Sequence, residues 1–335
     1  MTLTLLFRYL WLAKKPFKTV FVCRFSAGAA KLTKTGVTHA AARVTRAKLV
    51  KLIPKANLTR TAKESLYVNS ICALSNDTVL LACNDNGRLR SLSLHTGRLS
   101  ARDPVSGIVG HVLNVAYEGR TDTLLLVVRL AFDNWHLVSL RRKNADEWLE
   151  VQRLPINNSI TPLPQLAICG SRVLLGGGNS HPNYYKTLYM FDVSAEHNVS
   201  AAGTVAVEDR VFTMFACTRL GNDTLFALTY PDKGHVSLMR LESQRLEHLA
   251  FSEYINNPYD VLFFEELLLV ADNDQNGKNT IKLLQVSGGS LTDLRVLGGI
   301  RDKSTLRAWT LSNDRLLFLD NHSAAKMALI VYSFE

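Results

Sequence analysis

"LSNDTVLLACNDNGRLRSLSL", residues 74–94, reads as a turn, an apolar run, a second turn and an alternating run. The Asn-Gly pair at 86–87 joins the two runs. Asn-Gly between two strand patterns is a strong hairpin signal, because both residues tolerate a positive φ. The alternation in "LRSLSL" is typical of a strand with one buried face. The stretch therefore predicts two antiparallel strands.

The same order of turn and strand recurs along the chain. Further copies begin near residues 119, 169, 221, 264 and 311, and equivalent turn positions are 42 to 52 residues apart. An apolar run precedes each turn, and an alternating run follows each apolar strand. The first five copies add a weaker fourth run. A period in the forties with several short strands per copy is typical of a β-propeller blade.

The two ends of the chain complement each other. The sixth copy ends at Glu335, directly after its third strand. The missing strand has a candidate in "AKLVKLIP", residues 47–54, which alternates and precedes the first copy. Pairing with residues 328–334 would close the ring and protect the sheet edges. We therefore predict an all-β, six-bladed β-propeller of four-stranded antiparallel blades, whose last blade is closed by an N-terminal strand.

In architecture, residues 47–335 resemble the WD40-like propeller class. The Gly-His and Trp-Asp signature of that class is absent apart from Gly110-His111. The resemblance thus implies a divergent propeller, and this fold hosts both scaffolds and enzymes.

Charge divides the chain into two parts. The net charge is +10, yet residues 1–63 hold 14 Lys and Arg and no Asp or Glu. The remainder has 25 basic and 29 acidic residues, a net charge of −4. We predict a basic, disordered leader over 1–40 and a single propeller domain over 41–335. This distribution does not predict specific nucleic-acid binding, which usually needs a basic patch on the folded face.

Cysteine usage and hydropathy bear on the compartment. The five cysteines are an odd number without a CxxC pair, and several lie in apolar runs. Buried, reduced thiols are expected, which favours the cytoplasm. A mitochondrial location is the alternative, if the basic leader is a presequence. We expect a monomer without a transmembrane segment, since the first apolar run is broken by Arg8.

"DNDQNG", residues 272–277, matches the first half of an EF-hand calcium loop. The bidentate glutamate of such a loop would fall at Leu283, inside a strand pattern, and no helix follows. Aligned with "NDNG" at 84–87, the stretch is instead predicted to be a hairpin between the second and third strands of the fifth blade.

The loops between second and third strands should all emerge on one face of the propeller. They combine aromatic residues with polar ones, a composition typical of binding hot spots. The main functional hypothesis is a non-enzymatic scaffold that binds a protein or peptide on this face. An alternative role for these aromatics is to support neighbouring blades. The predicted binding residues are Asp133, Trp135, Tyr184, Tyr185, Tyr230, Asp232, Asp272 and Asp274.

The second functional hypothesis is a metal-dependent hydrolase. Six-bladed enzymes of the lactonase type are similar in strand count, and this resemblance implies a divalent ion held by acidic and Asn side chains at the channel. The candidates for it are Glu265, Asp272 and Asp320. GxSxG, HExxH, nucleotide fingerprints and zinc spacings are all absent. No catalytic residue, resident metal or cofactor is therefore predicted.

Overall fold

A computed structural model describes the backbone of residues 50–57 and 68–334, with gaps at 76, 84–86, 97–98, 101–102, 106, 132–133, 146, 157–164, 171, 177–186, 208–214, 274–278, 301–305, 313–314 and 324–325. Side chains are described between residues 68 and 294. The predicted leader, residues 1–40, lies outside these ranges.

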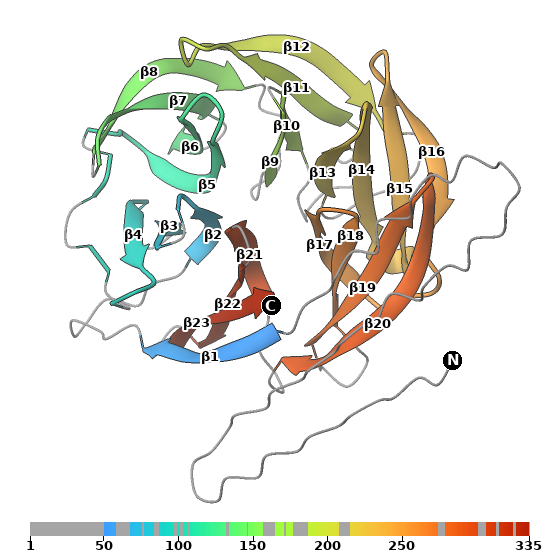
Figure 1. The fold of residues 1–335 in the computed structure, drawn as a ribbon. Helices are drawn as coiled ribbons and strands as arrows, with labels where there is room; N and C mark the ends of the chain where they lie inside the picture. Colours follow the sequence, from blue (N-terminus) through green and yellow to red (C-terminus); the bar gives the residue numbers. More distant parts are fainter. Residues whose placement is uncertain are drawn as a thin grey trace, which may run out of the picture.

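The described chain consists almost entirely of strands, which form separate antiparallel sheets around a common centre (Figure 1). Four sheets follow chain order. They comprise β5 (His111–Glu118), β6 (Thr123–Ala131), β7 (Asn134–Asn144) and β8 (Glu147–Ile156); β9 (Gln165–Cys169), β10 (Arg172–Gly176), β11 (Thr187–Val193) and β12 (Val199–Ala206); β13 (Phe215–Leu220), β14 (Asp223–Tyr230), β15 (His235–Glu242) and β16 (Arg245–Phe251); and β17 (Pro258–Phe264), β18 (Leu267–Asn273), β19 (Asn279–Ser287) and β20 (Ser290–Ile300).

A fifth four-stranded sheet joins the two ends of the described chain. Its members are β21 (Leu306–Ser312), β22 (Arg315–Ser323), β23 (Lys326–Phe334) and β1 (Val50–Asn57). β1 pairs antiparallel with β23, with Val50 opposite Phe334 and Leu52 opposite Tyr332. The predicted closure by an N-terminal strand is confirmed.

The remaining sheet has three strands: β2 (Val68–Ala73), β3 (Thr78–Cys83) and β4 (Leu89–Ser93). The all-β propeller is thus confirmed, but the prediction of six four-stranded blades is wrong, since five sheets have four strands. In the region predicted to be the fourth strand of the first blade, Leu99 forms only an isolated bridge to Leu92. Beyond it, the carbonyl of Pro104 accepts a hydrogen bond from the Trp148 N–H of β8. The segment therefore leaves its own sheet for the neighbouring one.

The core lies between the sheets rather than inside any one of them. Leu80 of β3 and Leu126 of β6 belong to one buried cluster, and Val127 of β6 and Val173 of β10 belong to the next. The β6 sheet thus buries both faces against its neighbours. The inner strands β2, β5, β9, β13, β17 and β21 contact one another in cyclic order and surround the axis.

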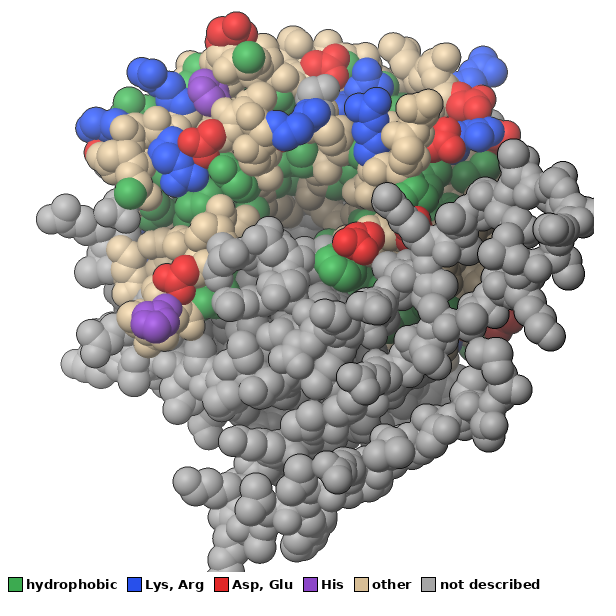
Figure 2. Space-filling view, viewed as in Figure 1, with side chains coloured by type: hydrophobic (Ala, Val, Ile, Leu, Met, Phe, Trp, Pro, Cys, Tyr) green, Lys and Arg blue, Asp and Glu red, His purple; other side chains and the backbone are tan. Residues whose placement is uncertain are grey.

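The described outer surface is polar and of mixed charge. Lys and Arg side chains alternate with Asp and Glu over the visible rim (Figure 2). Several form ion pairs, such as Arg142 with Asp122 at 2.9 Å and Arg153 with Glu150 at 2.7 Å. Within the described ranges, no helix is long and apolar enough to cross a membrane.

Candidate functional site

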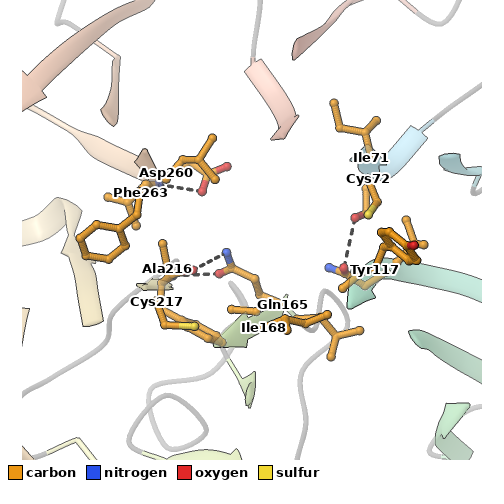
Figure 3. Close-up of a pocket in the computed structure, with 18 of the residues that line it drawn as sticks. Ile71, Cys72, Tyr117, Gln165, Ile168, Ala216, Cys217, Asp260 and Phe263 are labelled. Carbon is orange, nitrogen blue, oxygen red and sulfur yellow. Dashed lines mark hydrogen bonds between the residues drawn. The ribbon is translucent and has the colours of Figure 1, made fainter. Parts of the chain in front are cut away.

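A cavity of about 250 Å³ lies at the axis, lined by β2, β5, β9, β13 and β17 (Figure 3). Each of these strands contributes three or four consecutive residues to the wall. A site at this position receives side chains from five sheets at once.

Polar side chains line the cavity near the beginnings of the inner strands. These residues are Asn69, Ser70, Asn114, Gln165 and Asp260. In β2, β5 and β17 the pairing with the next strand is interrupted by a bulge just before Ser70, Asn114 and Asp260 respectively. A bulge changes the direction of the following side chain and is common beside active sites. The bulges therefore explain how polar residues of an apolar strand reach the axis.

Hydrogen bonds hold several of these groups in place. Ser70 Oγ donates to Asn114 Oδ1 over 3.1 Å, which joins β2 to β5. The Asp260 side chain is buried, and its Oδ1 accepts a 2.8 Å bond from the N–H of Val261. Asn69 Nδ2 is buried and has no hydrogen-bond partner among the described residues. An unpaired buried donor beside a cavity is a feature that a ligand would satisfy.

Gln165 joins β9 to the neighbouring β13. Its Nε2 donates to the Phe215 carbonyl oxygen over 2.7 Å, and its Oε1 accepts from the Phe215 N–H over 2.9 Å. The side-chain amide thus pairs with the backbone as a strand neighbour would. Both hydrogen bonds hold the Gln165 side chain in place in the cavity wall.

The later residues of the inner strands are less polar and include two thiols that border the cavity, Cys72 and Cys217. In Figure 3, Cys72 lies across the cavity from Asp260. Burial raises the pKa of Cys72 to about 12, against the smaller opposing effect of a hydrogen bond with the Tyr117 backbone. This thiol is therefore protonated at neutral pH.

The structure buries two of the predicted aromatic anchors. Trp135 is 4% exposed and packs in the core between the sheets of β5 and β9. Tyr230 is 2% exposed and packs with Phe215 and Phe226. The expectation that these rings are exposed for a partner is wrong: strand ends of one sheet are covered by the next.

Two of the other predicted binding residues lie in the part of the chain that the structure describes. Asp232 is exposed in the short 3-10 helix η1 (Pro231–Lys233). Asp272 is 4% exposed, and its Oδ1 accepts a 2.9 Å bond from the Asn257 N–H. The remaining predicted residues, Asp133, Tyr184, Tyr185 and Asp274, lie outside the described ranges.

Two of the three proposed metal ligands, Glu265 and Asp272, are separated. Glu265 lies in the turn before β18 begins, whereas Asp272 is near the end of that strand. Since a strand rises about 3.3 Å per residue, these carboxylates are at opposite ends of the sheet. Asp320 belongs to β22, whose side chains lie outside the described part. Among the described residues, no group of three or more His, Cys, Asp and Glu could hold a metal ion.

Sequence reasoning missed the channel residues, although a signal was present. The apolar inner-strand runs "VNSICAL", "HVLNVAY", "LPQLAIC" and "YDVLFFE" each contain a polar residue near the start. Those residues are Asn69 and Ser70, Asn114, Gln165 and Asp260. A polar residue recurring at one place in a repeated apolar strand indicates a common polar surface. The bulges that orient them have no comparable sequence signature.

Comparison with known proteins supports the fold. No family model matches the chain, and no curated protein matches it in sequence. Among solved structures it is similar to the soluble aldose sugar dehydrogenase of Escherichia coli, with a TM-score of 0.55 and 12% identity over 85% of this chain and 99% of that one. It is also similar to a Thermus thermophilus protein described as a putative oxidoreductase (glucose dehydrogenase), with a TM-score of 0.57 and 14% identity over 84% and 99%.

These comparisons correct two sequence-based interpretations. The resemblance to a propeller is confirmed in architecture, but nothing connects the chain to the WD40 class in particular. The non-enzymatic scaffold hypothesis is overturned, because the similar structures are those of dehydrogenases and two of its four aromatic anchors are buried. The alternative hypothesis of an enzymatic propeller agrees better with these structures than the scaffold does, and at 12% and 14% identity they establish the fold alone.

Proposed function

We propose that this chain is an enzyme that binds a small, hydroxyl-rich substrate of the sugar class in its central channel and oxidises one of its hydroxyl groups. The observation that carries the proposal is the convergence of amide and carboxylate groups from separate sheets on one cavity. Asn69, Asn114, Gln165 and Asp260 all line it.

The chemistry of these groups suits a sugar. A side-chain amide offers both a donor and an acceptor, and an ionised carboxylate accepts hydrogen bonds only. Sugar hydroxyls donate and accept, so they complement a mixed set of this kind. The unpaired Nδ2 of Asn69 is a donor that a sugar oxygen would satisfy. A volume of about 250 Å³ suits a small ligand rather than a polymer.

Asp260 is the residue that we assign to proton transfer. Its carboxylate is the only acidic group in the cavity wall that the structure describes. Oxidation of an alcohol removes the hydroxyl proton together with a hydride equivalent, and a carboxylate within hydrogen-bond reach can accept the proton. The hydride equivalent, with its two electrons, must pass to a separate two-electron acceptor, and an oxidised redox dye serves as that acceptor in the assay.

The two similar structures support an oxidation over other reactions. Both are dehydrogenases by description, one of aldose sugars and one of glucose, and the chain covers 99% of each. At 12% and 14% identity this likeness establishes the fold, so the reaction itself stays a proposal.

A dye-linked dehydrogenase assay with a panel of aldoses and polyols tests the proposal. The wild-type protein is expected to reduce the dye in the presence of at least one sugar. Asp260→Asn should lower kcat by roughly 100-fold or more, since loss of a proton acceptor typically costs 10²–10⁴ in rate. The substitution keeps the oxygen that accepts from Val261. Asp232→Asn, on the exposed η1 helix, is the matched control and should leave activity unchanged.

Two results would contradict the proposal. One is the absence of sugar-dependent dye reduction across the panel. The other is an Asp260→Asn variant that retains wild-type kcat and KM.

A further inference from the structure

Two cysteines face each other where the β9 sheet meets the β13 sheet. Side chains alternate along a strand, so Gln165 and Cys169 lie on the same face of β9. That face is turned toward β13, because Gln165 bonds the Phe215 backbone. Cys217 shares a face of β13 with Phe215. Cys169 and Phe215 belong to one buried cluster, against which Cys217 packs.

A hydrogen bond from the Cys217 thiol is the largest influence on the pKa of Cys169 and lowers it below the ordinary value, outweighing the effect of burial. Arg219, Arg172 and Arg120 add to this decrease. For Cys217, burial and then the same bond raise the pKa well above its ordinary value.

Arginines surround the Cys169 end of this pair. Gly170 follows Cys169 with a φ of 67°, and a Cβ built there would lie 3.7 Å from Nη2 of Arg120. The Arg120 guanidinium therefore lies above the turn that contains the thiol. Arg219 is exposed at the end of β13. A cationic environment of this kind stabilises a thiolate.

We propose that Cys169 and Cys217 form a redox site that a hydroperoxide converts to a disulfide joining the β9 and β13 sheets. Both residues are free cysteines in the structure. Cys217 borders the channel cavity, which gives a molecule as small as hydrogen peroxide a route to the pair. This inference does not depend on the proposed sugar oxidation.

The reaction balances with peroxide as the oxidant. The Cys169 thiolate attacks one peroxide oxygen, so that an S–O bond forms, the O–O bond breaks and the other oxygen leaves as hydroxide and becomes water. The Cys217 sulfur then attacks the Cys169 sulfur, the S–S bond forms and the S–O bond breaks. The departing hydroxyl group takes up the Cys217 proton and leaves as the second water. Two thiols are oxidised by two electrons in total, and one peroxide yields two waters.

Peptide mapping of the full chain tests the site. The reduced protein is treated with equimolar hydrogen peroxide, the remaining thiols are blocked with N-ethylmaleimide, and the protein is digested without reductant. We expect a linked peptide pair containing Cys169 and Cys217, two hydrogens lighter than the separate peptides and released by dithiothreitol. Cys169→Ser and Cys217→Ser should each abolish it.

Cys72→Ala is the matched control, since Cys72 also borders the cavity but has a raised pKa. It should form the linked pair as the wild type does. The wild-type map alone decides the case if a serine variant does not fold. Full alkylation of both cysteines after peroxide, oxidation of Cys169 to sulfinic acid without a link, or a disulfide between other cysteines would overturn the proposal.

Discussion

Two contacts between neighbouring inner strands show how one scaffold gives different chemistry. Between β2 and β5, a side-chain hydrogen bond runs from Ser70 to Asn114 at 3.1 Å. The thiol nearby, Cys72, is bordered by apolar residues and has a pKa of about 12. This contact is stabilised mainly by apolar packing, and its cysteine is an unreactive thiol at neutral pH.

Between β9 and β13, two bonds from Gln165 hold the Phe215 backbone. Here the thiol of Cys169 faces a second thiol, and its pKa is lowered. Both contacts join the inner strands of neighbouring sheets. The difference arises from the side chain that the neighbouring sheet presents, so the reactivity of a buried cysteine is set by the partner strand.

Removal of the Gln165 amide should weaken the contact between β9 and β13. Gln165→Ala removes two hydrogen bonds from the Phe215 backbone in a partly buried position. Loss of a buried hydrogen-bond partner costs about 1–3 kcal/mol, so the free energy of unfolding should fall by roughly 2–4 kcal/mol. Urea unfolding measures this change. Gln244→Ala is the control, since its bond to Ala202 is exposed and 3.4 Å long; an equal loss in both variants would refute the role of Gln165.

The two contacts should also differ in thiol reactivity. Only thiolate reacts with iodoacetamide, and a lowered pKa places the thiolate of Cys169 at lower pH. Alkylation of Cys169 should therefore level off below the ordinary thiol pKa, whereas that of Cys72 should keep rising up to about pH 12 or until the protein unfolds. Peptide mass spectrometry of timed samples should show at least a tenfold faster reaction at Cys169 near pH 7.5. Similar pH profiles would remove the distinction.

The contact between β2 and β5 should tolerate loss of the hydrogen bond from Ser70 to Asn114. Ser70→Ala removes the donor to Asn114, and a typical neutral bond contributes about 1 kcal/mol. Thermal or urea unfolding should show a decrease of that size, clearly below that of Gln165→Ala. A decrease as large as that of Gln165→Ala would mean that the two contacts are equivalent.

The repeat in the sequence predicts most of the fold because a propeller is local: each sheet is a run of neighbouring hairpins. Residues 47–54 were predicted to close the ring, and the observed strand β1 begins at Val50. "DNDQNG" was predicted to be a hairpin, and β18 and β19 do pair up to Asn273 opposite Asn279. The incomplete first sheet was not predicted. The sequence around Leu99 has a strand-like pattern, but Leu99 forms only one bridge to its own sheet, and Pro104 is already hydrogen-bonded to β8 of the next one.

The candidate site was predicted far less well. Exposure of Trp135 was inferred from a loop-like neighbourhood, yet the next sheet covers it. Asp260 was overlooked, because its access to the channel depends on a bulge that follows from pairing, not from local composition. Residues that converge from separate repeats become visible only when the repeats are placed in a ring.

The most direct test of the channel site is a crystal structure of the protein with a sugar from the active panel. We expect density for the sugar in the cavity, with a hydroxyl within hydrogen-bond distance of the Asp260 carboxylate and an oxygen near Asn69 Nδ2. A sugar bound on the outer loops, or an empty channel at saturating sugar, would contradict it.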